Sequence, residues 1–229
     1  MVSRLSWKNF VNKSKTLNSN LMQPTSNTGL LIVISAPSGG GKTTLCNQLL
    51  LNGENILRAV TCTTRAPREG EKDGIDYFFL DATTFLKRVQ AGDFLEHATV
   101  YGNSYGTLKT EVLAKIRQGK DVLLSIDVQG AATISQHAAL DDELGSAVVA
   151  VFLAPKSIAV LEDRLRKRNQ DSSATIQKRL SVARQEITQS KHFDYILFSG
   201  TIEEDLRRML SIIAAEKLRQ HRTVLPPYE

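Results

Sequence analysis

Short apolar runs alternate with segments of helical periodicity from Leu30 onward. A buried parallel strand is a nearly continuous apolar run, whereas a crossover helix repeats apolar residues every three or four positions. The alternation therefore predicts an α/β fold with a parallel sheet and crossover helices. The predicted strands are residues 30–35, 57–62, 122–126, 148–153 and 195–198.

Helical periodicity is clearest in two of the intervening segments. One precedes Gly119 and the other follows residue 172. Residues 61–107 instead show short strands and turns around one small helix near 83–90, which predicts an insertion into the α/β core. The apolar positions of the two helices are Leu108, Val112, Leu113 and Ile116, and then Ile176, Leu180, Ala183 and Ile187.

The first 28 residues differ from the rest of the chain. They are rich in Ser, Asn, Thr and Lys, contain no Asp or Glu, and their apolar residues follow no sustained period. We expect a disordered polar and basic N-terminal extension. Two alternatives remain open: an organelle transit peptide, and a translation start at Met22.

Length and charge restrict the class of protein. The chain has 229 residues and a net charge of +5, of which the N-terminal extension carries four charges, leaving +1 for residues 29–229. We therefore expect one domain over 29–229 and no nucleic-acid partner. No apolar run is long enough to span a membrane, and the two cysteines form no metal-ligand cluster, which favours a cytoplasmic protein. Homo-oligomer formation remains open.

A glycine-rich segment supplies the strongest chemical signal. The segment Ser-Ala-Pro-Ser-Gly-Gly-Gly-Lys-Thr-Thr, residues 35–44, follows a predicted strand and precedes a predicted helix, as a phosphate-binding loop (P-loop) does. Its amides and the helix N-terminus bind phosphate, Lys42 reaches the β- and γ-phosphates, and Thr43 ligates Mg²⁺. A flexible turn is the alternative. The expected ATP-binding residues are Ala36, Pro37, Ser38, Gly39, Gly40, Gly41, Lys42, Thr43 and Thr44.

A second motif lies in residues 61–79. Arg65 and Arg68 stand three residues apart around a proline, with Tyr77 following. Guanidinium groups fork onto paired phosphate oxygens, so these side chains can converge on one phosphate. A solvated turn with surface ion pairs is the alternative for this stretch alone.

Together with the P-loop, these residues resemble the guanylate kinase family. The family's signature is matched in order by Thr-Thr-Arg at 63–65, Pro-Arg at 67–68, Gly-Glu at 70–71, Gly74, and Asp-Tyr at 76–77. The match continues at 94–96, 102–107, 126–130 and 164–186, so the resemblance covers about residues 29–220.

The resemblance implies a P-loop NTPase-type enzyme that transfers the γ-phosphate of ATP to GMP, giving ADP and GDP for guanine nucleotide salvage and GTP and dGTP supply. Glu96 has independent support, because a carboxylate accepts from both N1–H and the N2 amino group of guanine, which adenine lacks. The implied GMP-binding residues are Arg65, Arg68, Tyr77 and Tyr105 for the phosphate, and Thr61, Glu96 and Thr107 for the base.

Catalysis requires charge neutralisation around both substrates. Asp127 follows a predicted strand, where its carboxylate can order metal-bound water; a helix N-cap is the alternative. Basic residues in 164–186 resemble a lid over the phosphates, with a solvated helix face as the alternative. The expected catalytic residues are Lys42, Arg65, Arg168, Arg179 and Asp127, and the expected Mg²⁺ ligands are Thr43 and, through water, Asp127.

Five positions depart from the family's pattern. Ala36 replaces the first P-loop glycine, Ser125 replaces an Asp, Asn169 replaces a lid Gly, and residues 199–200 are Ser-Gly where Asn-Asp is usual. Two rival functions follow: a non-catalytic guanylate-kinase-like interaction module, and a P-loop kinase for another acceptor. Lys42 and Thr43 argue against the first, and Glu96 and Thr107 against the second.

Overall fold

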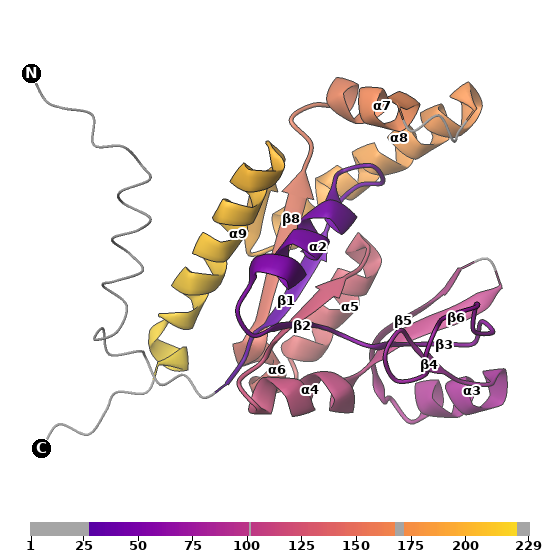
Figure 1. The fold of residues 1–229 in the computed structure, drawn as a ribbon, viewed down its shortest axis with the longest axis vertical. Helices are drawn as coiled ribbons and strands as arrows, with labels where there is room; N and C mark the ends of the chain where they lie inside the picture. The colour runs from indigo at the N-terminus through magenta and orange to yellow at the C-terminus, as the bar shows by residue number, and fades with distance from the viewer. Residues whose placement is uncertain (1–27, 101, 168–171, 224–229) are drawn as a thin grey trace, which may run out of the picture.

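The computed structural model describes residues 28–100, 102–167 and 172–223. The expectations for residues 1–27, Arg168 and Asn169 lie outside these residues. The chain forms an α/β core around a five-stranded sheet, in which every neighbouring pair of strands is parallel (Figure 1). The strand order is β2 (Ile56–Arg58), β7 (Asp121–Ser125), β1 (Leu31–Ser35), β8 (Val148–Ala154) and β9 (Tyr195–Phe198).

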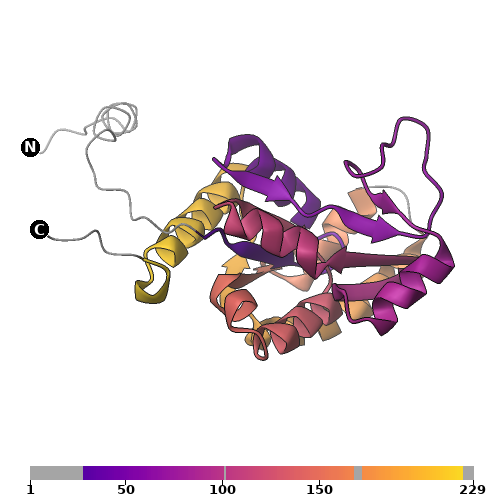
Figure 2. The same ribbon diagram turned by 90° about the horizontal axis from the view of Figure 1, so that it is seen from below.

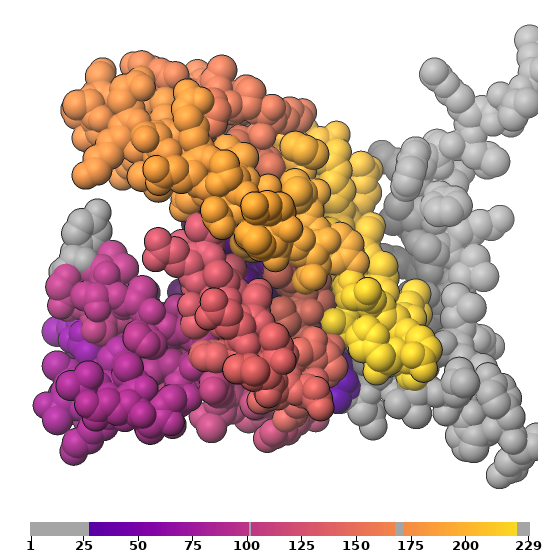
Figure 3. All heavy atoms as spheres, turned by 180° about the vertical axis from the view of Figure 1, so that it is seen from behind, coloured from indigo at the N-terminus to yellow at the C-terminus, as the bar shows by residue number. Residues whose placement is uncertain are grey.

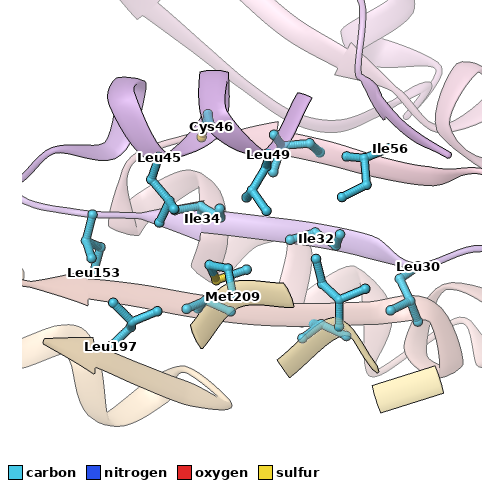
Figure 4. Close-up of a cluster of buried hydrophobic side chains, with 14 of the residues drawn as sticks. Leu30, Ile32, Ile34, Leu45, Cys46, Leu49, Ile56, Leu153, Leu197 and Met209 are labelled. Carbon is cyan, nitrogen blue, oxygen red and sulfur yellow. The ribbon is translucent and has the colours of Figure 1, made fainter. Parts of the chain in front are cut away.

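Helices cover both faces of this sheet, so β1 is buried along its whole length. Leu30, Ile32 and Ile34 point to one face and pack under α2 (Lys42–Asn52) and α9 (Ile202–Lys217) (Figure 4). Leu31 and Val33 point to the other face, beneath the remaining core helices. Those helices are α4 (Lys109–Arg117), α5 (Val128–Ala138) and α6 (Asp142–Ala147).

A smaller sheet stands to one side of the core (Figure 2). Its strand order is β4 (Phe78–Phe79), β3 (Thr61–Thr63), β6 (Asn103–Leu108) and β5 (Phe94–Val100). The helix α3 (Ala82–Gln90) covers one face, where Cys62, Phe85 and Phe94 pack together.

The prediction of a single strand at 57–62 was wrong. The chain forms β2 in the main sheet and then β3 in the smaller sheet. Between them Ala59 is buried in the main core and donates its N–H to Leu123 O at 3.1 Å. Residues 56–63 therefore contribute to both sheets. The apolar pattern does not reveal where the chain passes from one sheet to the other, because the backbone stays extended there.

Two helices form a separate layer above the carboxyl end of the main sheet. They are α7 (Ile158–Lys167) and α8 (Ser173–Thr188), which pack on each other through Leu161, Leu165 and Leu180. Figure 3 shows an open hollow between these helices and the smaller sheet. Among the described residues, no helix has both the length and the apolar character needed to cross a membrane.

A buried ion pair ties the end of the described chain to the start of strand β8. Arg222 contacts the carboxylate of Glu216 on α9, and it also donates to Ser146 O at 2.7 Å and Val148 O at 3.3 Å. Arg219 contacts the same carboxylate at 3.3 Å, but its side chain is 57% exposed. The two arginines therefore form a matched pair, one buried and one exposed.

Arg222→Ala should lower the free energy of unfolding by roughly 3 to 5 kcal/mol, because it leaves a buried carboxylate without its main partner. Arg219→Ala should lower it by less than about 1 kcal/mol, since water screens that pair. Urea unfolding of the three proteins checks both values. Equal losses would show that burial does not distinguish the two contacts.

Candidate active site

The loop between β1 and α2 adopts the backbone of an anion-binding loop. Gly41 has φ 99°, a conformation that side chains disfavour, and it stands directly before the first residue of α2. A Cβ at Gly40 would lie 2.9 Å from Pro37 O. Ala36 fits in place of the usual glycine, because Asn55 is the only described non-glycine residue with positive φ. The loop therefore keeps glycine where the backbone requires it.

Lys42 and Thr43 form the first turn of α2. The Lys42 ammonium donates to Ile126 O at 2.6 Å, and burial lowers the pKa of Lys42 although Cys46, Asp127 and Glu186 oppose that shift. The Thr43 side chain is exposed. Both residues line a cavity of about 320 Å³ together with the rest of the loop, so the predicted ATP-binding residues 36–44 surround one space.

Asp127 lies at the same edge of the sheet, because β1 and β7 run parallel with Ile34 beside Ser125. Its Oδ1 accepts from Gln129 N at 3.1 Å and Gly130 N at 2.8 Å, so it caps α5. The side chain also lines the P-loop cavity. Asp127 is therefore both the N-cap of α5 and a residue of the P-loop cavity.

Glu186 is a residue of this cavity that the sequence interpretation did not assign. It comes from α8, and its Oε2 is buried with no hydrogen-bond partner among the described residues. Burial raises the pKa of Glu186, while Lys42 and the Ser38 N–H favour its charged form. Helical spacing gives no sign of it, because only the packing of α8 over the loop brings it there.

The oxygen donors of the cavity suit a hard divalent cation. A hydroxyl from Thr43 and carboxylates from Asp127 and Glu186 are the groups that Mg²⁺ prefers, usually with retained water. The buried Oε2 of Glu186 can accept from such a water. These residues therefore fit a magnesium ion held between the P-loop and the carboxylates.

The basic residues of α7 and α8 are only partly placed as expected. Arg168 lies outside the described residues, and Arg179 is half-buried on α8. Arg164, which belongs to the basic cluster but was not among the expected catalytic residues, donates to Gly40 O at 3.4 Å and to Ser199 Oγ at 3.2 Å. Arg164 and Ser199 line a second cavity of about 300 Å³ beside the P-loop.

The smaller sheet aligns the three residues expected to bind the base. Thr61 on β3 pairs with Thr107 on β6, which pairs with Glu96 on β5. The Thr107 hydroxyl donates to Glu96 Oε1 at 2.8 Å, and Glu96 is only 8% exposed. Burial raises the pKa of Glu96, against the opposing effect of Thr107.

A β-bulge in β5 sets the direction of Glu96. The register shifts between Phe94 and Glu96, so Leu95 is the extra residue. Phe94 packs with α3 and Leu95 packs into the main core, and both side chains are buried. His137 Nδ1 lies 2.9 Å from Leu95 O. The bulge thus anchors the backbone next to Glu96 on two sides.

Residues expected to bind the acceptor phosphate lie after β3, directly before β4 and on β6. The Arg65 guanidinium lies 5.4 Å from the centre of the Tyr77 ring, and the Tyr77 and Tyr105 rings are 6.3 Å apart. Arg68 is exposed on the same turn. Arg65 also pairs with Glu71, which the sequence interpretation did not assign to the site.

The two acceptor subsites are spaced for one nucleotide. Tyr105 and Thr107 are two residues apart on β6 and share a face, which separates them by about 7 Å. This face is opposite the one that α3 covers, and in Figure 1 it lies toward α7 and α8. The residues expected to bind the acceptor therefore lie on the side of the smaller sheet on which the hollow of Figure 3 opens.

Comparisons with known proteins agree on one family. The family model described as guanylate kinase matches residues 28–216. The chain is 43% identical to the guanylate kinase of Coxiella burnetii, over 83% of this chain and 89% of that protein. It is 41% identical to that of Maricaulis maris, over 85% and 86%. The crystal structure of guanylate kinase from Anaplasma phagocytophilum superposes with a TM-score of 0.64 at 35% identity, covering 86% of this chain and 91% of that one.

Glu96→Gln should stabilise the fold at neutral pH. The raised pKa of Glu96 means that folding disfavours its charged carboxylate. This cost in folding free energy is present when the pH is above the pKa of Glu96 in the folded protein. It disappears as the pH falls below 4.5, the ordinary pKa of a glutamate. Urea unfolding should show a gain at pH 7.5 that shrinks toward pH 4.5, and the exposed Glu54→Gln serves as control. A pH-independent difference would contradict a buried charge at Glu96.

Proposed function

This chain belongs to the guanylate kinase family, and we propose that its P-loop binds ATP while its smaller sheet binds GMP. The enzyme transfers the γ-phosphate of ATP to GMP, giving ADP and GDP. In this reaction ATP is the phosphate donor and GMP is the acceptor. The P-loop residues line one cavity, and the expected base-binding residues share the face of the smaller sheet opposite α3, which supports the assignment.

The buried position of Glu96 is the observation that best supports GMP as the acceptor. Its carboxylate is buried and held by Thr107 on the face of the sheet opposite α3. Guanine offers two neighbouring donors, N1–H and the N2 amino group, which both carboxylate oxygens can accept. Adenine would leave this buried charge without those two donors, and a mismatch of this kind discriminates strongly.

The acceptor phosphate binds between Arg65, Arg68, Tyr77 and Tyr105 in this proposal. Arginine forks and tyrosine hydroxyls donate to phosphate oxygens. The aromatic contacts of Tyr77 with Arg65 and with Tyr105 support a preformed subsite. GMP is then held at both ends, with its phosphate directed toward the donor.

ATP binds with its phosphates in the P-loop cavity and its base in the cavity lined by Arg164 and Ser199. Lys42 leaves Ile126 O to donate to phosphate oxygens, since its ammonium ends a long side chain that lines the same cavity. Thr43 and, through water, Asp127 hold Mg²⁺. When bound, the ion neutralises charge on the β- and γ-phosphates.

Transfer requires the two subsites to approach and water to leave. The helices α7 and α8 carry Arg164 and Arg179, Arg168 lies between them in sequence, and we assign this segment the role of a lid. Arg164 already spans the lid and the P-loop through Gly40 O. Closure brings further positive charge to the transferring phosphoryl group and excludes water from it.

We also place the reaction in the cytoplasm. Cys46 and Cys62 are both free and buried, as expected for a reducing compartment. ATP and GMP are the substrates, and none of the steps above involves nucleic acid.

Lys42→Ala should lower turnover of GMP with ATP and Mg²⁺ by a factor of about 100 to 1,000, because the donor phosphates lose their mobile cation. The melting temperature should change little, since Lys42 supports no core contact. A coupled ADP-release assay measures the rate, with the exposed Lys87→Ala as control. Near-normal turnover in folded Lys42→Ala would refute the P-loop assignment.

Glu96→Gln should lower kcat/KM for GMP roughly 30- to 1,000-fold, since an amide cannot accept from both guanine donors. The rate with AMP should fall far less, because the Gln amide can donate to adenine N1. The measured quantity is the ratio of kcat/KM for GMP to that for AMP. A general folding defect lowers both rates together, whereas an unchanged ratio would move guanine recognition away from Glu96.

A further inference from the structure

Glu71 sits between the two arginines of the acceptor phosphate subsite. Arg65 Nη2 donates to both of its carboxylate oxygens, at 2.8 and 3.0 Å. The backbone N–H of Arg68 donates to Glu71 Oε2 at 2.8 Å, and Glu71 N donates back to Arg68 O at 3.1 Å. One carboxylate thus holds the guanidinium of the first arginine and the backbone of the second.

The pairing fixes the direction of the Arg65 side chain. Arg65 Nη1 donates to Ala66 O at 2.7 Å, and the guanidinium lies over the Tyr77 ring. The Arg65 and Glu71 side chains are 15% and 20% exposed, so both are largely covered. The Arg65 guanidinium holds the pKa of Glu71 below its usual range, and the carboxylate therefore stays charged at neutral pH.

Two opposite effects on a bound phosphate follow from this carboxylate. Its negative charge lies near the subsite and weakens the attraction for an anion. Its contacts also hold a long, flexible side chain in one orientation, which reduces the ordering that binding would otherwise require. If repulsion between the Glu71 charge and the phosphate dominates, removing Glu71 tightens phosphate binding. If the fixed orientation of Arg65 dominates, removing Glu71 weakens it.

We propose that Glu71 is a positioning residue that orients Arg65 and the Arg68 backbone for the phosphate of GMP. The inference rests on the proposed function and extends it to a residue that does not itself bind the substrate. Orientation dominates because the carboxylate engages both arginines at once and its ion pair is largely covered. A covered, multiply bonded pair restricts motion more than an exposed pair does.

Glu71→Gln keeps the side-chain shape but removes the charge and one acceptor oxygen. The affinity for GMP, measured by calorimetry without ATP, should fall roughly tenfold or more, and KM for GMP should rise with it. KM for ATP should stay unchanged. Guanosine, which has the base and ribose but no phosphate, should bind the variant and the original protein equally, because Glu71 acts only on the phosphate end.

Two controls separate positioning from charge and from misfolding. Glu69→Gln removes a negative charge from the same turn at an exposed residue, and it should leave GMP affinity unchanged. In an Arg65→Ala background, Glu71→Gln should cause a smaller loss than in the original protein, because the part of its effect that passes through Arg65 is already absent. An equal loss of guanosine binding would indicate local misfolding and overturn the inference.

Tighter GMP binding by Glu71→Gln would overturn the inference in favour of a charge effect. Unchanged GMP binding would show that Glu71 has no role in binding the phosphate. These outcomes leave the proposed function intact when the original protein phosphorylates GMP. If the original protein neither binds nor phosphorylates GMP, the proposed function is wrong and this inference falls with it.

Discussion

The parallel alignment of β1 and β7 is the constraint on which the rest of the active site depends. Parallel strands end at the same edge of a sheet, so the P-loop after β1 and Asp127 after β7 meet although they are distant in sequence. Apolar residues on both faces of β1 maintain this alignment by packing under helices on each side. Loss of the register would separate Lys42 from Ile126 O and from the carboxylates of the cavity.

The acceptor site uses a charge that the fold does not favour. Glu96 is buried, and its charged form is opposed by desolvation and by Asp127. A single neutral donor from Thr107 offsets only part of this cost. The remaining acceptor capacity is what a guanine base can satisfy, so the same burial that costs stability supplies discrimination between bases.

The donor and acceptor sites are built on different principles. The donor loop relies on backbone amides and a helix N-terminus, which the glycine conformations arrange locally. The acceptor site relies on side chains from several strands and on contacts such as Arg65 with Glu71 and Tyr77. The helices α7 and α8 add to the donor site, because Arg164 and Glu186 reach the P-loop from them.

Local sequence determined the parts of this protein in which neighbours along the chain act together. The α/β alternation, the strand–loop–helix context of the P-loop and the order of the signature residues each depend on nearby positions, and they predicted the fold and the family. The exchange of sheets at Ala59 and the bulge at Leu95 were decided by packing between distant segments. The same holds for Glu186 and Arg164, whose contacts with the P-loop depend on where α7 and α8 lie, and such positions leave no periodic trace in the sequence.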